Sequence, residues 1–229
     1  MEGTIFEKIE QRTIQHEAVD LIRAAIVSGK LELGQHLAEN SLADQMAVSR
    51  IPIREALRQL EQEGLVIRVP NKGCWVIDFQ DEDVDEVFSL RATLECMAIE
   101  WAIPNLSPED ISELRNLIEQ QHQTIMIEDY NHLAYLDMKF HEYICIKANH
   151  RRLLQSWYAQ HAQCQILLNR RFRILPSYTP KTVVNDHALI LQAIEQKDVQ
   201  TAMQLTRSIS ERVVEECKEV LRRIHQKKV

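Results

Sequence analysis

Three arginines in the first third of the chain are spaced for contact with a nucleic acid. Arg50, Arg54 and Arg58 recur every four residues, so in a helix they follow one another along a face. A guanidinium group pairs bidentately with phosphate or with the edge of guanine. Taken alone, such a row is better explained as the solvated face of an ordinary helix. The elements that display these arginines must therefore decide between a solvated helix face and a nucleic-acid contact.

A second set of side chains has the types that ligate a divalent metal ion. Asp137 and His141 are four residues apart on an apolar helix face, and His187 opens another helix with an inward apolar stripe. A buried carboxylate and imidazole need partners, which either a metal ion or an Asp–His hydrogen bond supplies. For the pair alone, the hydrogen bond is the simpler answer. His161 is also expected to face the core, and several histidines in one bundle favour a metal or ligand site.

Composition places these residues in a mainly helical protein without a surplus of basic charge. Five Gly and six Pro in 229 residues argue against a loop-rich β fold, and the net charge is −7. Residues 1–78 hold 9 Lys and Arg against 12 Asp and Glu, so DNA binding must depend on where the cations lie. The odd number of cysteines, without a Cys-x-x-Cys pair, predicts idle thiols in a reducing cytosol. Without a signal peptide or a membrane-length apolar run, we expect a cytoplasmic protein with no membrane partner.

The elements expected around the arginines form a winged helix-turn-helix at 13–78. Its parts, after a polar extension at 1–12, are a helix from Thr13 to Gly29, a short helix capped by Asn40 or Ser41, a third helix from Ser49 to about Glu63, and strands at 65–69 and 74–77 around a turn at 70–73. Arg50 and Arg54 then lie at the exposed start of the third helix, and Lys72 lies at the hairpin tip. This arrangement favours DNA contact.

The remainder of the chain is predicted to be an all-α bundle. An acidic linker at 79–83 separates it from the first domain, and residues 84–225 follow helical periodicity. Expected helices lie at about 82–102, after the cap Ser107, and at about 130–147, 150–172, 181–196 and 198–225.

The first domain resembles the DNA-binding domain of the GntR family of bacterial regulators. The matching residues are Ser49 to Leu57, Leu60, Glu63 to Leu65 and Asn71 to Gly73, with Gly29 to Leu31, Gly34, Leu42 and Ala43 upstream. The resemblance implies that Ser49, Arg50, Ile51, Pro52 and Arg54 meet the major groove, and that Lys72 and Gly73 lie in or beside the minor groove. The position of Asn40 often carries a phosphate-contacting arginine in this family, so asparagine is expected to make a weaker contact.

The bundle resembles the FCD domain, the helical effector domain of the FadR subfamily of GntR regulators. The matching residues are Arg91, Leu94 and Glu95, the Asp-x-x-Phe-His run ending at His141, Asn149 with Leu153 and Leu154, and His187 with Ala193, Ile194 and Asp198. The resemblance implies a small-molecule effector site.

Metal-binding members of this family hold zinc, nickel or a similar ion with one Asp and three His. Asp137, His141 and His187 match three of those positions, but Thr206 to Ile209 stand where the fourth histidine is expected. His161 is a candidate substitute and a candidate effector contact. Arg91 is the expected contact for an effector carboxylate; its alternative is an ion pair with Glu95.

Three functions remain open at this point. The favoured one is a ligand-responsive regulator, expected to be a repressor, which binds a near-palindromic operator as a homodimer and is not an enzyme. The second is a metal-dependent hydrolase in which Asp137, His141 and His187 activate water, although no hydrolase motif accompanies them. The third is a helical interaction bundle without an effector.

Overall fold

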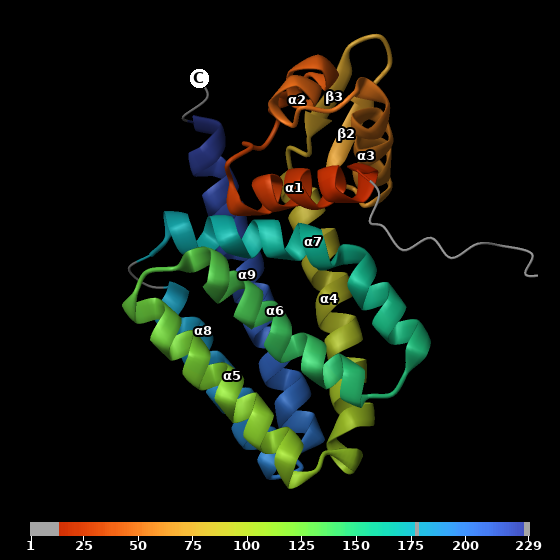
Figure 1. Ribbon diagram of the computed structural model, residues 1–229. Coiled ribbons are helices and arrows are strands. Elements are labelled where there is room, and N and C mark those ends of the chain that lie inside the picture. The colour runs from red at the N-terminus through yellow and green to blue at the C-terminus, as the bar shows by residue number, and fades with distance from the viewer. Residues whose placement is uncertain (1–13, 177–178, 227–229) are drawn as a thin grey trace, which may run out of the picture. The chain divides into compact units, whose positions relative to one another are not determined.

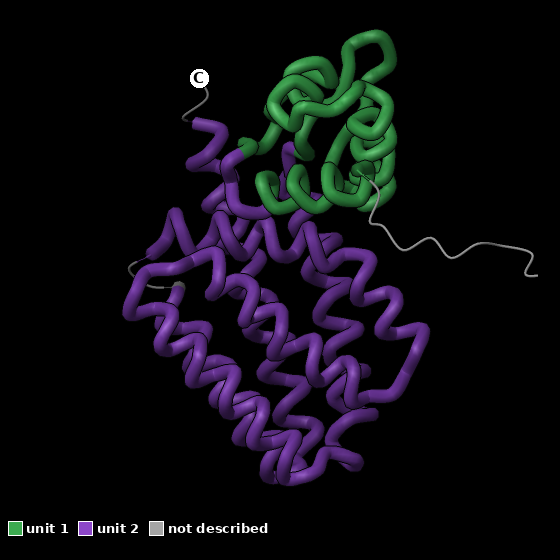
Figure 2. Tube along the Cα trace, in the orientation of Figure 1, with its two compact units in different colours: residues 1–26, 31–77 green, residues 27–30, 78–229 purple. Residues whose placement is uncertain are grey.

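The computed structural model describes residues 14–176 and 179–226, so the extension expected at 1–12 lies outside the described residues. These residues form nine α-helices, a 3-10 helix and a three-stranded sheet (Figure 1). They divide into two compact units: residues up to Ile26 with 31–77, and residues 27–30 with those from Asp78 onward (Figure 2). The predicted fold class, mainly α with an N-terminal winged helix-turn-helix and a helical second domain, is confirmed. Within these ranges no helix has the length and apolar character needed to cross a membrane.

The first unit is a three-helix assembly with a small antiparallel sheet. Its elements are α1 (Ile14–Ser28), β1 (His36–Leu37), α2 (Glu39–Gln45), α3 (Arg50–Gln62), β2 (Val66–Val69) and β3 (Gly73–Val76). Apolar side chains at helical spacing, such as Ile22 and Ile26 on α1 and Leu57 and Leu60 on α3, are at most 1% exposed. They form the core that fixes α3, while the opposite face of α3 remains in solvent.

The sheet has one more strand than the sequence predicted. Its order is β1-β3-β2, with Val66 opposite Val76 and Val69 opposite Gly73 in the hairpin. Strand β1 pairs His36 with Trp75 along the other edge of β3. A two-residue strand is too short for an alternating pattern, so β1 was not predicted as a strand.

Two predicted helix caps differ from the observed ones. Ala38 occupies the cap position of α2, so Asn40 and Ser41 lie inside its first turn. Ser49 does occupy the cap position of α3, but its side chain makes no capping hydrogen bond. That hydroxyl therefore stays at the exposed end of α3.

The second unit is built from six α-helices and one 3-10 turn. They are α4 (Asp81–Ala102), η1 (Ile103–Asn105), α5 (Pro108–Met126), α6 (Tyr130–Lys147), α7 (Arg151–Ile174), α8 (Thr179–Glu195) and α9 (Val199–Gln226). The predicted linker at 79–83 is shorter in the structure, because Gln80 caps α4 in a reciprocal bond with Asp83 and Phe79 is fully buried. Acidic residues in this first turn favour helix because they lie at the positive end of its dipole.

Helix α4 is the central element of the second unit. It packs against α6, α7 and α9, and α5 packs against α6 and α8 (Figure 1). Trp157, Phe140 and Phe172 fill the core, and all five cysteines are buried and free. The core also holds charged and polar side chains with exposed fractions of 7% or less, at Arg91, Glu95, Asp137, His141 and His187. Because buried charge is costly without partners, this cluster marks a candidate site.

Candidate functional site

The exposed face of α3 carries the side chains expected to contact DNA. Arg50 and Arg54 are exposed on the side opposite the buried Ile53 and Leu57. Ile51 is 71% exposed, which is unusual for a large apolar side chain. Ser49 is exposed and Pro52 is half-buried at the same helix end. All five side chains therefore lie at or near the free N-terminus of α3.

Helix α2 contacts both arginines. Arg54 Nε donates to Glu39 Oε2 at 3.2 Å, and Arg50 Nη1 donates to Asn40 Oδ1 at 3.3 Å. Glu39 Oε1 also lies 3.9 Å from Nη1 of Arg68. Glu39 could not be predicted from the sequence, because nothing in its spacing links it to α3. The carboxamide oxygen of Asn40 accepts from Arg50. The weak phosphate contact expected of Asn40 stays a prediction.

The turn between β2 and β3, which is the tip of the wing, exposes the other two residues predicted to contact DNA. Lys72 and Gly73 are exposed, and the Lys72 backbone N–H closes the turn to Val69 O at 3.0 Å. Gly73 has a φ of +110°, and a Cβ there would lie 2.8 Å from His36 Nε2. Glycine is therefore required by both the backbone angle and the neighbouring ring.

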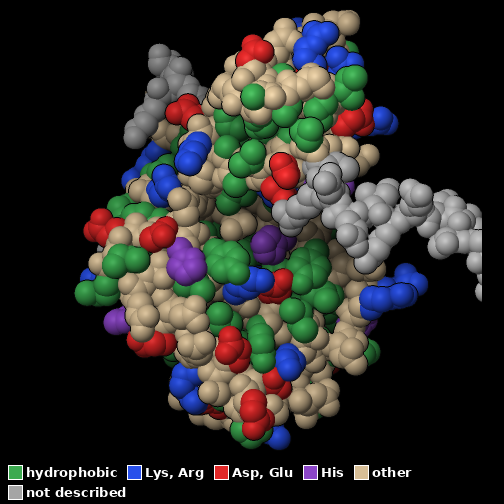
Figure 3. Space-filling model, viewed as in Figure 1, with side chains coloured by type: hydrophobic (Ala, Val, Ile, Leu, Met, Phe, Trp, Pro, Cys, Tyr) green, Lys and Arg blue, Asp and Glu red, His purple; other side chains and the backbone are tan. Residues whose placement is uncertain are grey.

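One face of the molecule shows how its basic side chains are distributed. On the face drawn in Figure 3, Lys and Arg side chains are scattered among acidic and polar ones. This agrees with the net charge of −7. Any DNA contact then depends on the positions of a few arginines and lysines, as the sequence indicated.

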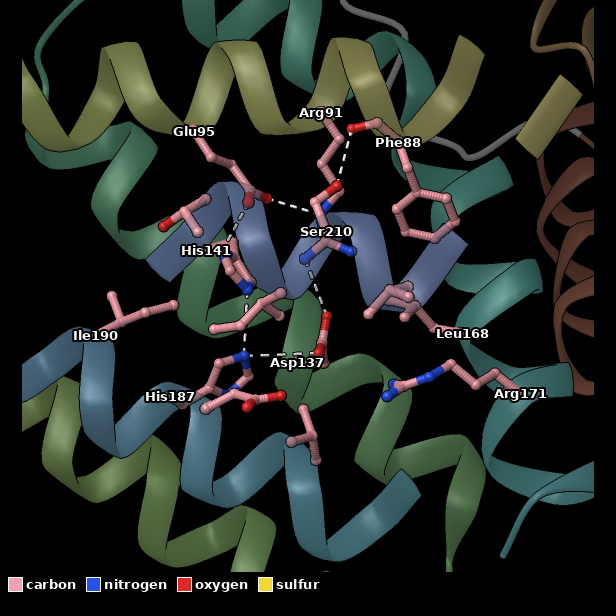
Figure 4. A pocket seen from close by; sticks show the side chains of 15 residues that line it. Phe88, Arg91, Glu95, Asp137, His141, Leu168, Arg171, His187, Ile190 and Ser210 are labelled. Atoms are coloured by element: carbon pink, nitrogen blue, oxygen red, sulfur yellow. Dashed lines mark hydrogen bonds and ion pairs between the residues drawn. The ribbon is translucent and has the colours of Figure 1, made fainter. Parts of the chain in front are cut away.

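The polar cluster of the second unit brings together three predicted metal ligands. One ligand atom from each of Asp137, His141 and His187 lies within 4.8 Å of the others, and all three residues are buried. The two Nε2 atoms are 3.1 Å apart, and Asp137 Oδ1 lies 3.6 Å from His187 Nε2. Figure 4 shows the three side chains pointing toward one another from α6 and α8.

Hydrogen bonds to the two rings determine which nitrogen carries a proton. Gln121 Nε2 donates to Leu136 O at 3.1 Å, so its Oε1, 2.8 Å from His187 Nδ1, is the acceptor and Nδ1 donates. Likewise, His141 Nδ1 donates to Glu95 Oε2 at 3.0 Å. In neutral rings both Nε2 atoms then carry lone pairs directed at each other. A proton or a metal cation between them removes that repulsion.

The donor set fits a zinc or nickel ion. Two imidazole nitrogens and one carboxylate oxygen suit either metal and leave a coordination position open. Asp137 uses Oδ2 to accept from Arg91 Nη2 at 3.1 Å, which leaves Oδ1 directed at the histidines. Glu95 and Gln121 orient the rings from behind, as outer partners of metal-bound histidines do. Gln121 was missed in the sequence, because a lone glutamine on α5 carries no recognisable motif.

Helix α9 supplies hydroxyl groups where the fourth histidine was expected. Thr206 and Ser210 line the pocket, but Thr206 Oγ1 donates to Ala202 O at 2.9 Å and Ser210 Oγ to Phe88 O at 3.2 Å. Each hydroxyl thus donates its proton to a backbone carbonyl oxygen. Among the described residues, the cluster therefore offers three candidate protein ligands.

Arg91 is held by carboxylates, in agreement with its alternative interpretation. Its Nε donates to Glu95 Oε1 at 2.7 Å, and Trp157 Nε1 donates to the same oxygen at 3.3 Å. Burial raises the pKa of Glu95, but the charges of Arg91 and His141 outweigh burial and lower it to about 2. Burial lowers the pKa of His187 to about 3, so that ring is neutral at physiological pH.

A second arginine, which no sequence motif indicated, lines the same pocket. Arg171 is 1% exposed, and its Nε donates to Glu216 Oε2 at 2.5 Å. Its Nη2 is buried without a hydrogen-bond partner. Figure 4 shows its guanidinium directed into the pocket from α7, on the side opposite the histidines. Because buried guanidinium N–H groups are costly to leave unpaired, this atom marks a place for an anion.

The pocket is small. Its volume is about 30 Å³, compared with the roughly 10–15 Å³ that one ordered water needs. An ion with a short polar group fits this space, whereas a drug-sized ligand does not.

His161 lies apart from the cluster of ligands. Its ring contacts Trp157 and Tyr158, with centroids 5.2 and 6.4 Å away. It does not belong to the group whose ligand atoms converge. Burial lowers the pKa of His161. The structure therefore gives no support to His161 as a substitute fourth ligand.

Comparison with known proteins identifies both units. A family model described as "Bacterial regulatory proteins, gntR family" matches residues 14–76, and one described as "FCD domain" matches residues 86–212. The gluconate operon transcriptional repressors of Bacillus licheniformis and Bacillus subtilis (strain 168) are each 32% identical over 77% of this chain and 74% of their own length. The solved structure of Escherichia coli McbR/YncC has a TM-score of 0.73 at 22% identity, over 91% of this chain and 99% of that one.

Proposed function

Because the chain belongs to the GntR family of bacterial regulators and carries its FCD domain, we propose that this transcriptional regulator is a ligand-responsive repressor. It binds a near-palindromic DNA operator as a homodimer. The observation that carries the DNA-binding half is the exposed Arg50 and Arg54 face of α3, backed by a fully buried apolar face. The names of the gluconate operon repressors support repression as the sign of regulation.

The DNA contacts come from one helix end and the wing. Ser49, Arg50, Ile51, Pro52 and Arg54 meet the major groove. An α-helix fits this groove, arginine pairs there with guanine, and an apolar side chain such as Ile51 meets a thymine methyl group. Lys72 and Gly73 lie at the minor groove or its phosphates. So few cations bind weakly in one copy, and two copies on a two-fold symmetric site multiply their effect.

A divalent zinc or nickel ion is the cofactor that the pocket suits. Asp137, His141 and His187 hold it, and Glu95 and Gln121 keep the two rings in the tautomer that binds it. The ion supplies positive charge at an open coordination position.

The effector is a small organic anion, such as a short carboxylate. Arg91 was the sequence candidate for this contact, but it is engaged by Glu95 and Asp137. We assign the contact to Arg171, whose Nη2 is free of partners in the pocket wall. The anion lies between the metal position and Arg171. It changes DNA affinity to the extent that it binds the DNA-competent and DNA-incompetent states unequally.

The DNA half of this proposal is tested with duplexes selected from a randomised library by the full-length protein. We expect selective, salt-sensitive binding. Arg50→Ala and Arg54→Ala should each weaken binding about tenfold or more, since a bidentate base contact contributes on the order of 1–3 kcal/mol. Arg222→Ala, at a half-exposed arginine of α9, is the matched control. Wild-type affinity in both α3 variants would refute the assigned face.

The pocket half is tested by metal analysis and calorimetry. Protein purified without chelator should contain one zinc or nickel ion per chain, and Asp137→Ala and His141→Ala should lose it. With zinc bound, acetate should bind, and Arg171→Gln should bind it at least tenfold more weakly. A chain that retains no metal and titrates no zinc would refute the pocket proposal while leaving the DNA proposal intact.

The hydrolase alternative gains no support. The two gluconate operon relatives are named transcriptional repressors, and the family model that matches residues 14–76 is that of bacterial regulatory proteins. The Asp/His/His site accordingly serves ligand binding in our proposal. A metal-dependent hydrolytic turnover that survives removal of residues 1–78 would reverse this assignment.

A further inference from the structure

The first turn of α2 contacts both recognition arginines of α3. Glu39 accepts from Arg54, and its chain neighbour Asn40 accepts from Arg50. We call Glu39 and Asn40 the bracing pair. We propose that the bracing pair is a specificity determinant: it orients the two arginines for base edges and disfavours their use on phosphates alone. This inference rests on the proposed DNA-binding function.

The contact to Arg54 leaves its base-reading edge available. Glu39 engages Nε, at 3.2 Å, and among the described residues no hydrogen-bond partner is present at the two terminal nitrogens of Arg54. Those two nitrogens form the fork that pairs with O6 and N7 of guanine. The contact between Glu39 and Arg54 therefore persists when a base is bound, and it restricts the Arg54 side chain before binding. Arginine has much such freedom to lose, so prior ordering favours binding.

Asn40 acts on Arg50 in the same way. The bond uses Nη1, so Nε and Nη2 remain as a second two-donor edge. Because the Asn40 carboxamide oxygen accepts from Arg50, only the neutral NH₂ group of Asn40 remains for contact with DNA. Asn40 is therefore a positioning residue in this proposal, rather than the phosphate contact that the family resemblance implied.

The charge of Glu39 acts on specific and non-specific complexes alike. Its side chain is 26% exposed beside Arg54, which is 53% exposed, so the carboxylate lies at the DNA-facing surface. A carboxylate near the phosphate backbone weakens every complex, because like charges repel. This repulsion lowers specific and non-specific affinity together. The expected gain in their ratio therefore comes from the orientation of Arg54 by Glu39.

The chain offers a matched control on the same helix. Asp44 is exposed on α2, and among the described residues no cation pairs with its carboxylate. Asp44→Ala removes the same charge as Glu39→Ala without releasing an arginine. A purely electrostatic effect would make the two variants alike.

The experiment measures the affinity of the full-length chain for two duplexes. One is selected by the wild-type protein from a randomised library, and the other is a shuffled sequence of the same composition. We expect Glu39→Ala to lower the affinity ratio about three- to tenfold, since an exposed pair contributes a few-fold at each of two half-sites. Glu39→Gln keeps an acceptor for Nε and should restore most of the ratio. Asp44→Ala should tighten both complexes and leave the ratio within about twofold of wild type.

A double-mutant cycle tests whether Glu39 acts through Arg54. In the Arg54→Ala background, Glu39→Ala should no longer change the ratio. An equal fall in both backgrounds, or a ratio within twofold of wild type in Glu39→Ala, overturns the inference for Glu39. Melting curves that match wild type confirm that each variant is folded.

Asn40→Ala gives an independent reading. Loss of a positioning contact lowers the ratio, whereas loss of a phosphate contact weakens both complexes equally and leaves the ratio unchanged. The second result would overturn the role given to Asn40. If the wild-type protein selects no duplex at all, the DNA-binding proposal fails first. Selective wild-type binding with unaltered variants leaves that proposal standing and removes the bracing pair.

Discussion

At the scale of single residues, the ability of the buried cluster to bind a cation depends on which ring nitrogens of His141 and His187 carry protons. Gln121 and Glu95 each accept from an Nδ1 atom, which directs the Nε2 atoms of His187 and His141 at one another. A glutamine and a carboxylate outside the ligand set thus decide whether the rings can receive a cation. The metal affinity of the site should depend on both.

Replacing the glutamine tests this dependence. Gln121→Leu is close in volume and removes the acceptor for His187 Nδ1, so the ring is no longer held in the metal-binding tautomer. Zinc affinity, measured by isothermal titration calorimetry, should fall about 10- to 100-fold. Gln123→Leu, an exposed position on the same helix, is the control and should bind zinc as wild type does. Equal affinity in both variants would contradict the role of Gln121.

At the scale of elements, the first turns of the helices are stabilised in different ways. Ser107 accepts from Asp110 N, and Asp110 accepts from Ser107 N at 2.9 Å, which closes a reciprocal cap on α5. Ser49 holds the same position on α3 without a capping bond from its side chain. The two serines therefore contribute unequally to stability.

Two serine variants measure this difference. Ser107→Ala should lower the free energy of unfolding by about 1 kcal/mol, because one cap bond is lost. Ser49→Ala should lower it by a few tenths of a kcal/mol at most, in line with the missing bond. Urea denaturation followed by circular dichroism gives both values. A larger loss in Ser49→Ala would show that its hydroxyl caps α3 in solution.

The elements also show which parts of the fold and of the candidate site could be predicted from the sequence. Helix α6 was placed at 130–147 and observed as Tyr130–Lys147, because long apolar periodicity with clear ends leaves little ambiguity. Strand β1 was missed, since two residues show no period. Asp137, His141 and His187 were found by side-chain type. Gln121 and Glu39 were not, because their partners are 66 and 15 residues away in sequence and only the fold brings them together.

At the scale of the whole molecule, a neutral histidine in the core makes stability depend on pH. The pKa of His187 is about 3 in the folded protein because of burial, against 6.5 as its ordinary value. Between these values the unfolded chain binds a proton that the folded one refuses. This contribution to stability is complete above about pH 6.5 and is lost as the pH falls toward 3.

Melting in the presence of a chelator measures this loss. From pH 6.5 to 4.5 the free energy of unfolding should fall by up to about 1.4 kcal/mol per pH unit for His187. His161, whose pKa burial also lowers, adds in the same direction. The carboxylates with lowered pKa values, Glu95 and Asp137, act mainly below this window. His187→Gln should flatten the slope by one proton, and a variant with the wild-type slope would assign the acid sensitivity elsewhere.

The indole of Trp157 gives the pocket an optical signal of its own. This side chain is 1% exposed and donates to Glu95, which orients His141. Trp101, by contrast, is 49% exposed, and Trp75 is half-buried. Iodide should therefore quench the emission of Trp101 and spare that of Trp157. Any cation entering between the histidines changes the field at Trp157, so the unlabelled protein reports pocket occupancy by its own fluorescence.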